Sequence, residues 1–309
     1  MNTILNILYR ITFYWLFLIL RRCRGFDSSF PISHPEWNQR GLALWYYRSF
    51  KPLLGLDLQY KNHLWSDDSI DVCIPALEKD SQMLKDVISS IRENIKHPVR
   101  NIYIVAPKDS KLIQEIATSF HCIFVDEQSI APLPKADIHY IVNDMDRSGW
   151  LYQQLLKLSI DKISDSELVL ICDADTMFIR DLVFTNKNKC IFNHSIERHL
   201  PYYETYYRIF NEDISSELSF VCHNMLFKQS WLKEMKEKIE SIHNEPWWKV
   251  IINKTDYHNI SGFSEYETYG NYCLKIHSSE IIREYWWNTT FLENCRKKSQ
   301  YKTFSNHQT

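Results

Sequence analysis

Apolar residues change their spacing repeatedly between residues 70 and 172, and this alternation limits the possible folds more than any other feature of the chain. Short apolar runs predict strands, whereas Leu84, Val87, Ile88 and Ile91 recur at the helical period and predict a helix between two runs. The predicted strands lie at 70–77, 101–106, 121–125 and 168–172, with an extended piece at 137–142 and a helix at 150–163. Strands that alternate with helices favour a mostly parallel sheet with helices on both faces, which is an α/β fold.

Scarce glycine and balanced charge exclude several classes of binding protein. The chain has six glycines and contains neither G-x-G-x-x-G nor G-x-x-x-x-G-K-[ST], so it lacks a dinucleotide fingerprint and a P-loop. Its formal net charge of -2 gives no support for a nucleic-acid-binding surface. The eight cysteines are scattered without metal-ligand spacing, and we expect them to be reduced residues of the core.

The N-terminal segment combines an apolar run with a basic cluster of three arginines just after it. We expect residues 1–24 to form a membrane-interacting helix, residues 25–68 a connecting arm, and residues 69–309 the main domain. Membrane contact would run through residues 4–24, because arginines beside an apolar helix favour anionic lipid and the cytoplasmic side. This predicts that the main domain lies at the cytoplasmic face of a membrane. The alternative is a helix that packs on the protein's own surface.

Two aspartates follow the last of the predicted strands. The apolar run Leu168–Cys172 leads directly into Asp173, Ala174 and Asp175. Side chains at positions i and i+2 of an extended segment share a face, so both carboxylates can bind one divalent cation. Carboxylate oxygens suit Mg²⁺ or Mn²⁺, and diphosphate oxygens can complete the coordination. We therefore predict a metal site at Asp173 and Asp175, with a plain solvated turn as the alternative.

Several motifs together resemble the GT-A glycosyltransferases, in particular a bacterial group found in capsule and lipopolysaccharide gene clusters. The resembling segments are DVCIPA (71–76) with Lys79 and Asp80, GWLYQQLLK (149–157), DAD (173–175), SFVCHNMLF (219–227) and FSEYETYG (263–270). The resemblance implies a GT-A-like domain, a nucleotide-sugar donor and a divalent metal. It further implies a glycan or lipid-linked glycan as acceptor, in the synthesis of surface polysaccharide.

The end of the first predicted strand is one place where this resemblance implies donor contacts. GT-A enzymes hold the nucleoside there, which implies that Pro75, Ala76, Lys79 and Asp80 contact the nucleotide sugar. Lys79 would meet a phosphate and Asp80 would bond the base. The alternative role of Asp80 is to cap the following helix.

The predicted helix after Gly149 carries a polar stripe. Trp150, Gln154 and Lys157 are spaced at i, i+4 and i+7 and therefore share one face. If this face points at the strand ends, the amide of Gln154 and the ammonium group of Lys157 contact the phosphates and the sugar, beside Asp173. The alternative is a solvated helix face.

Two glutamates late in the chain are candidates for catalysis. Glu265 and Glu267 lie near the start of a predicted helix, where the resemblance places the general base of an inverting enzyme. Such a base takes the proton of the attacking acceptor hydroxyl. Glu265 fits that position better, which leaves Glu267 as a candidate for acceptor binding. The alternative is a pair of carboxylates that only stabilise the helix start.

Two histidines are candidates for a third metal ligand or for an acceptor contact. His223 ends or interrupts the apolar run 220–227, and His277 follows later in the chain. A histidine on an apolar run is more often a hydrogen-bonded residue of the core, and this is the alternative for both.

Two other functions compete with sugar transfer. Phosphatases of the haloacid dehalogenase type place D-x-D-x-[TV] after an apolar strand, but here Thr176 comes one position early and Met177 fills the expected position. That motif also opens its domain, whereas several α/β units precede it here. The non-enzymatic alternative is an inactive membrane-associated scaffold.

Overall fold

The computed structural model describes Tyr47, Lys51, Leu56 and residues 64–195, 197–214, 216, 218–289 and 303–305. The chain divides into two compact units, Met1–Tyr60 and Lys61–Thr309. The predicted helix 1–24 and most of the predicted arm 25–68 lie outside the described residues. Within the described part of the chain, no helix has both the length and the apolar character needed to cross a bilayer. All elements named below belong to the second unit.

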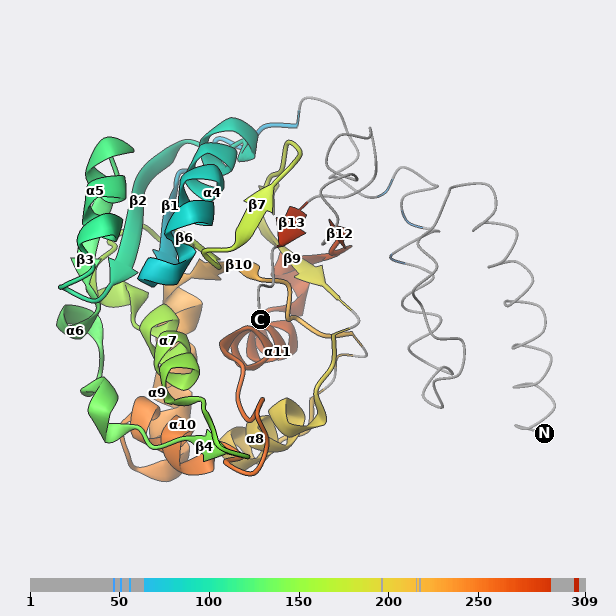
Figure 1. Cartoon of the computed structure of the whole chain (residues 1–309). Helices are drawn as coiled ribbons and strands as arrows, with labels where there is room; N and C mark the ends of the chain where they lie inside the picture. The colour runs from blue at the N-terminus through green and yellow to red at the C-terminus, as the bar shows by residue number, and fades with distance from the viewer. Residues whose placement is uncertain are drawn as a thin grey trace, which may run out of the picture. The chain divides into compact units, whose positions relative to one another are not determined.

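A five-stranded sheet lies at the centre of this unit, with the strand order β10-β6-β1-β2-β3 (Figure 1). The strands are β1 (Ile70–Pro75), β2 (Val99–Ala106), β3 (Ile123–Asp126), β6 (Leu168–Cys172) and β10 (Asn224–Lys228). The first four run parallel, and β10 pairs antiparallel with β6 at the edge. All six residues of β1 are buried, as a strand covered on both faces requires. The predicted α/β class with a mostly parallel sheet is confirmed.

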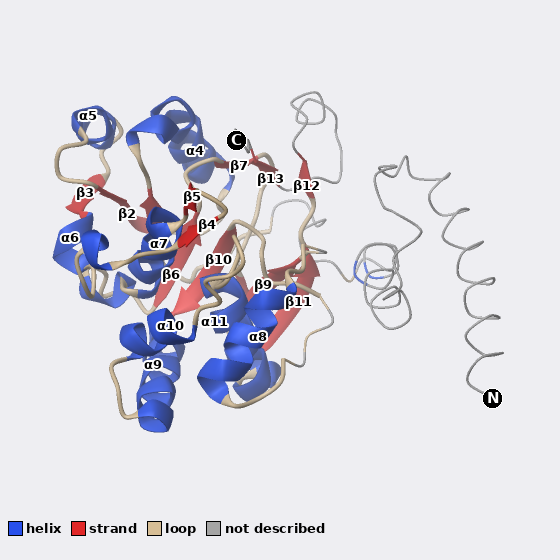
Figure 2. Ribbon diagram, turned by 60° about the horizontal axis from the view of Figure 1, so that its bottom comes forward, coloured by secondary structure: helices blue, strands red, loops and turns tan. Residues whose placement is uncertain are grey.

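Helices cover the sheet in two groups. They are α4 (Ser81–Asn94), α5 (Lys111–Ser119), α6 (Glu127–Ile130), α7 (Ser148–Leu158), α8 (Leu200–Phe210), α9 (Gln229–His243), α10 (Trp247–Lys254) and α11 (Glu265–Ile276). In Figure 2, α4 and α5 lie on one side of the sheet, and α7, α9 and α11 lie on the other. The apolar positions Leu84, Val87, Ile88 and Ile91 of α4 are fully buried, so its predicted apolar face packs into the core.

Short strands complete the unit. One small sheet has the order β11 (Ile281–Tyr285), β9 (Lys189–His194) and β8 (Thr185–Asn186), and another has the order β12 (Asn288–Thr289), β13 (Thr303–Ser305) and β7 (Thr176–Phe178). The strands β4 (Ile141–Val142) and β5 (Met145–Asp146) form a separate antiparallel hairpin.

The predicted extended piece at 137–142 differs from the structure. Lys135–Asp137 is a 3-10 helix, and only Ile141–Val142 forms a strand. Asn143 and Asp144 both have positive φ, 49° and 61°, which is the backbone that a tight two-residue hairpin turn needs. The turn chemistry therefore reverses the chain where an apolar pattern alone predicts a longer strand.

Candidate functional site

Three candidate metal ligands meet where β6 ends. Asp173 and Asp175 follow β6 directly, and His223 precedes β10 directly. Because β10 runs antiparallel to β6, its start lies beside the end of β6, and the backbone N–H of Asp173 donates to the carbonyl of His223 at 3.0 Å. His223 has a φ of 55°, in the left-handed region that is uncommon for residues other than glycine. Such backbone is frequent at functional sites.

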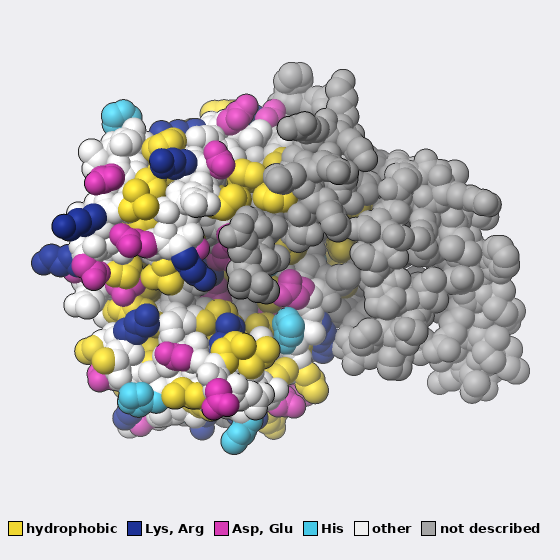
Figure 3. All heavy atoms as spheres, in the orientation of Figure 1, with side chains coloured by type: hydrophobic (Ala, Val, Ile, Leu, Met, Phe, Trp, Pro, Cys, Tyr) yellow, Lys and Arg dark blue, Asp and Glu magenta, His cyan; other side chains and the backbone are white. Residues whose placement is uncertain are grey.

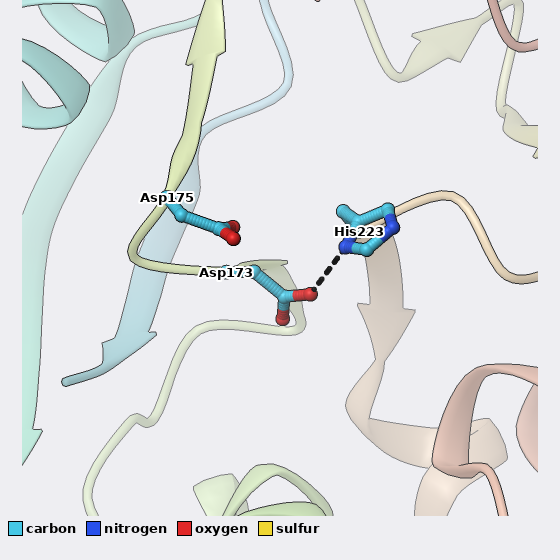
Figure 4. Close-up of side chains that lie close together, drawn as sticks. All are labelled: Asp173, Asp175 and His223. Atoms are coloured by element: carbon cyan, nitrogen blue, oxygen red, sulfur yellow. Dashed lines mark hydrogen bonds and ion pairs between the residues drawn. The ribbon is translucent and has the colours of Figure 1, made fainter. Parts of the chain in front are cut away.

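The arrangement of these side chains fits a divalent cation. One ligand atom from each of Asp173, Asp175 and His223 lies within 4.8 Å of the others, and Figure 4 shows the three side chains pointing toward one another. The Nδ1 atom of His223 lies 3.0 Å from Oδ2 of Asp173. Carboxylates suit Mg²⁺ and Mn²⁺, and imidazole nitrogen is the commonest metal ligand in proteins. A candidate acidic and histidine site for a cation therefore exists here.

A buried lysine joins this site to one of the predicted catalytic glutamates. The Nζ atom of Lys157, at the end of α7, lies 2.5 Å from Oδ1 of Asp173 and 2.6 Å from Oε1 of Glu265. The side chains of Lys157 and Glu265 are only 4% and 3% exposed. The hydroxyl of Tyr266 also donates to Oδ1 of Asp173, at 2.9 Å. The first turn of α11 and the last turn of α7 thus meet at the end of β6.

Burial and mutual attraction set the charges of this cluster. Burial raises the pKa of Glu265, and the ammonium group of Lys157 offsets only part of this. Burial lowers the pKa of Lys157, but Asp173 and Glu265 outweigh burial, so that this pKa lies above its ordinary value. Burial raises the pKa of Asp173, but Lys157 and His223 hold it below its usual range. Lys157 therefore stays charged, and Asp173 stays ionised.

Most of the predicted site residues line one cleft, with a volume of about 470 Å³. The predicted residues on its wall are Pro75, Ala76, Lys79, Asp80, Gln154, Lys157, Asp173, Asp175, His223 and Glu265. The strands β1 and β6 run parallel, so both end at the same edge of the sheet. Ligands of α/β proteins bind at this edge. On the face in Figure 3, acidic, basic and hydrophobic side chains are interspersed over the described residues.

Two of these residues make contacts that the sequence did not indicate. Asp80 stands before α4, but its Oδ2 accepts from the backbone N–H of Leu77 at 2.9 Å and does not cap that helix. The Oε1 atom of Gln154 accepts from the backbone N–H of Glu265 at 3.0 Å. Gln154 therefore also fixes the start of α11 relative to α7.

Glu267 and His277 are not among the residues that line the cleft. The carboxylate of Glu267 is fully buried and accepts from the Tyr203 hydroxyl at 2.8 Å and from the backbone N–H of Phe220 at 3.1 Å. Two residues along a helix correspond to a turn of about 200°, so Glu265 and Glu267 point to nearly opposite sides of α11. His277 lies just past the other end of α11, where its Nε2 is 2.8 Å from Oε2 of Glu234.

The cleft also contains four residues that no sequence pattern predicts. Glu197 lies 3.9 Å from Nε2 of His223, and together with Asp173 it raises the pKa of His223 to about 10, against the effect of burial. Arg147 and Lys135 also line the cleft, as does Tyr202. None of the four lies in a motif or a strand-end pattern, and no signal in a single sequence marks them.

Residues 69–306 match the model of a family that is described only as a family of unknown function, DUF6492. The chain belongs to this family. No curated protein matches it.

Among solved structures, the chain is similar to the apo form of mouse xyloside xylosyltransferase 1, with 13% identity and a TM-score of 0.42, over 77% of this chain and 98% of that one. It is also similar to glucosyl-3-phosphoglycerate synthase from Mycobacterium tuberculosis in complex with Mn²⁺, uridine diphosphate and phosphoglyceric acid, with 11% identity and a TM-score of 0.44, over 74% and 75%. A third match is the galactosyltransferase LgtC with donor and acceptor sugar analogues, with 11% identity and a TM-score of 0.38, over 76% and 86%. At these values the likeness alone supports no activity for this chain.

Proposed function

We propose that this protein is a metal-dependent glycosyltransferase, which moves a sugar from a nucleotide-diphosphate donor to a glycan or a lipid-linked glycan. The observation that supports this most is the placement of Asp173 and Asp175 at the end of β6, beside His223, on the wall of the cleft. The cleft volume of about 470 Å³ lies in the range of ligand-binding sites. Bound there, Mn²⁺ or Mg²⁺ would neutralise the diphosphate as a leaving group.

The donor would lie along the strand ends. In this scheme the segment from Pro75 to Asp80, after β1, contacts the nucleoside, and Lys79 contacts a phosphate. Gln154 and Lys157 enter the same cleft from α7, next to Asp173. The support for these roles is that all of these residues share one cleft with the candidate cation site.

Glu265 is the proposed general base. The acceptor hydroxyl oxygen bonds to the anomeric carbon while the bond from that carbon to the diphosphate oxygen breaks, and the nucleoside diphosphate leaves with the electron pair. Glu265 takes the proton of the attacking hydroxyl. Lys157 holds its Oε1 and favours the ionised carboxylate that a base must be. A single displacement of this kind inverts the configuration of the anomeric carbon.

We place this activity in the synthesis of bacterial capsule or lipopolysaccharide, at the cytoplasmic face of the inner membrane. The support is the sequence resemblance and the apolar, arginine-flanked segment 4–24, which we propose contacts the membrane.

A panel of nucleoside-diphosphate sugars tests the proposed function. We expect one donor to be hydrolysed slowly and to raise the melting temperature of the full chain, and only when Mn²⁺ or Mg²⁺ is present. Asp175→Asn should lose both effects and keep the circular dichroism spectrum of the wild type. Asp86→Asn removes an exposed carboxylate on α4 and should behave as the wild type. Donor effects that persist with a chelator, or hydrolysis of simple phosphate monoesters in place of nucleotide sugars, would contradict the proposal.

A further inference from the structure

Two cations near the start of α7 line the cleft and take no part in the proposed donor contacts. Arg147 and Lys135 both line the cleft, and neither forms an ion pair within the described part of the chain. The other cation near the centre of the cleft, Lys157, is already bound to two carboxylates. The carboxylates Asp146 and Glu127 also line the cleft and lie near Lys135, but neither is ion-paired with Arg147 or Lys135 within the described residues.

Arg147 is held in one position. Its Nε donates to the carbonyl of Ile260 at 2.7 Å, and its guanidinium carbon lies 4.5 Å from the ring centroid of Trp150. The ring of Trp150 is in turn stacked with Tyr202, with centroids 6.4 Å apart and 19° between the planes. The two Nη atoms have no hydrogen-bond partner within the described residues. A fixed guanidinium with two unused nitrogens matches the geometry of a carboxylate or a phosphate.

The surroundings of Arg147 also favour an anion. A methyl group on Gly149 would lie 3.4 Å from Nζ of Lys135, so the lysine amino group is close to the first turn of α7. The start of a helix carries partial positive charge. Two acidic groups lie near Lys135, namely Glu127 and Asp146. The carboxylate of Asp146 accepts from the backbone N–H of Ser148 at 2.8 Å, so it is already bonded to the first residue of α7. Burial lowers the pKa of Arg147, as expected for a guanidinium that lacks a bound anion.

This place in the cleft is distinct from the proposed diphosphate site. Arg147 precedes α7 and Lys157 lies near its end, which separates them by about 15 Å along the helix axis. Ile260, to which Arg147 is bonded, belongs to the segment that leads into Glu265 and α11. Burial raises the pKa of Tyr202, and the charges of Glu265 and Arg147 both act on this group, so Tyr202 lies near both of them. Tyr202 also lines the cleft, so Arg147 borders the part of the cleft that holds the proposed base, where an acceptor has to enter.

We propose that Arg147, assisted by Lys135, binds the carboxylate or phosphate group of an acidic acceptor. This inference rests on the glycosyltransferase function proposed above, and it adds the chemical class of the acceptor. The guanidinium of Arg147 packs on the ring of Trp150, which is stacked with Tyr202. The anionic group of the acceptor accepts hydrogen bonds from the two Nη atoms of Arg147.

Calorimetric titration of the full chain tests this proposal, in the presence of Mn²⁺ and uridine diphosphate and also without them. The probes are methyl glucuronide, glucose 6-phosphate and the neutral methyl glucoside. We expect at least one acidic probe to bind about tenfold more tightly than the glucoside, the ratio that a charge-assisted hydrogen-bond pair provides. The two acidic probes distinguish a carboxylate from a phosphate.

Variants assign the preference to the site. Arg147→Gln should bring the affinity ratio close to one, and Arg147→Lys should retain only part of it, because the ammonium group cannot form the paired contact. Arg208→Gln removes an arginine that does not line the cleft and should keep the full ratio. Equal affinities in the wild type, no binding of any probe, or a preference that survives in Arg147→Gln would overturn the proposal. If Mn²⁺ and uridine diphosphate do not bind but the acidic probes still bind more tightly than the glucoside, the glycosyltransferase proposal fails and the proposal for Arg147 stands.

Discussion

Replacing Lys157 by methionine tests the charge balance of the site. The ammonium group lies 2.5 Å from Asp173 and 2.6 Å from Glu265, and its side chain is 4% exposed. Methionine keeps most of the length and the apolar stem but leaves two carboxylates without their shared cation. Breaking a buried ion pair from one side destabilises a protein by about 3–5 kcal/mol, because the remaining charge is buried without a partner. We expect a loss in that range, at its lower end because the carboxylate of Asp173 retains some exposure and the hydrogen bond of Tyr266.

Urea denaturation, followed by circular dichroism, measures this free energy of unfolding. The substitution Glu265→Gln removes one of the two carboxylate charges that Lys157 neutralises. Lys157→Met should therefore destabilise the Glu265→Gln protein less than it destabilises the wild type. The coupling between the two substitutions should be about 1–3 kcal/mol. Lys85→Met is the matched control on the exposed face of α4, and it should change stability by less than about 0.5 kcal/mol. If Lys157→Met lowers the free energy of unfolding by less than about 0.5 kcal/mol, or if the effects of Lys157→Met and Glu265→Gln simply add, then Lys157 does not balance the two buried carboxylates.

Three further predictions concern a glycine of α11, a buried histidine and the two glutamates at the start of α11. Gly270→Ala should lower the free energy of unfolding by about 1–3 kcal/mol in urea, because the added methyl group would lie 2.5 Å from the ring of Phe220; a gain in stability, as for an ordinary helical glycine, would be the contrary result. Burial lowers the pKa of His97, so the unfolded chain binds more protons, and stability should fall as the pH drops through about 6.5; the fall, measured by thermal denaturation, should be smaller in His97→Gln. Glu265→Gln should lower turnover by about 10²–10⁴-fold with the fold intact, whereas Glu267→Gln should mainly lower the melting temperature; equal loss of turnover with equal stability would contradict this division.

The sheet and the acidic pair could be predicted because their signals are local. The apolar run Leu168–Cys172 forms β6 with the expected bounds, and the two aspartates follow it at once. The run at 70–77 likewise contains β1, and its buried pattern reflects coverage from both faces. Apolar periodicity and strand length are properties of neighbouring residues, so one sequence is enough to recognise them.

The partners within the cleft could not be predicted, because they depend on contacts between distant residues. Lys157 was expected to meet a phosphate, but its distance to Asp173 and Glu265 follows from how α7 and α11 pack on the sheet. The position of His223 depends on the antiparallel pairing of β10, which no local pattern indicates. The different surroundings of Glu265 and Glu267 could have been anticipated, since residues two apart on a helix face nearly opposite directions.

Electron paramagnetic resonance of Mn²⁺ bound to the full chain reports on the proposed cation site itself. We expect a single bound Mn²⁺ whose spectrum changes when uridine diphosphate is added, because the diphosphate becomes a ligand. We also expect Asp173→Asn and Asp175→Asn to lose the bound ion. Unchanged Mn²⁺ binding in Asp175→Asn, or a bound ion that does not respond to uridine diphosphate, would show that the two aspartates do not form a metal–diphosphate site.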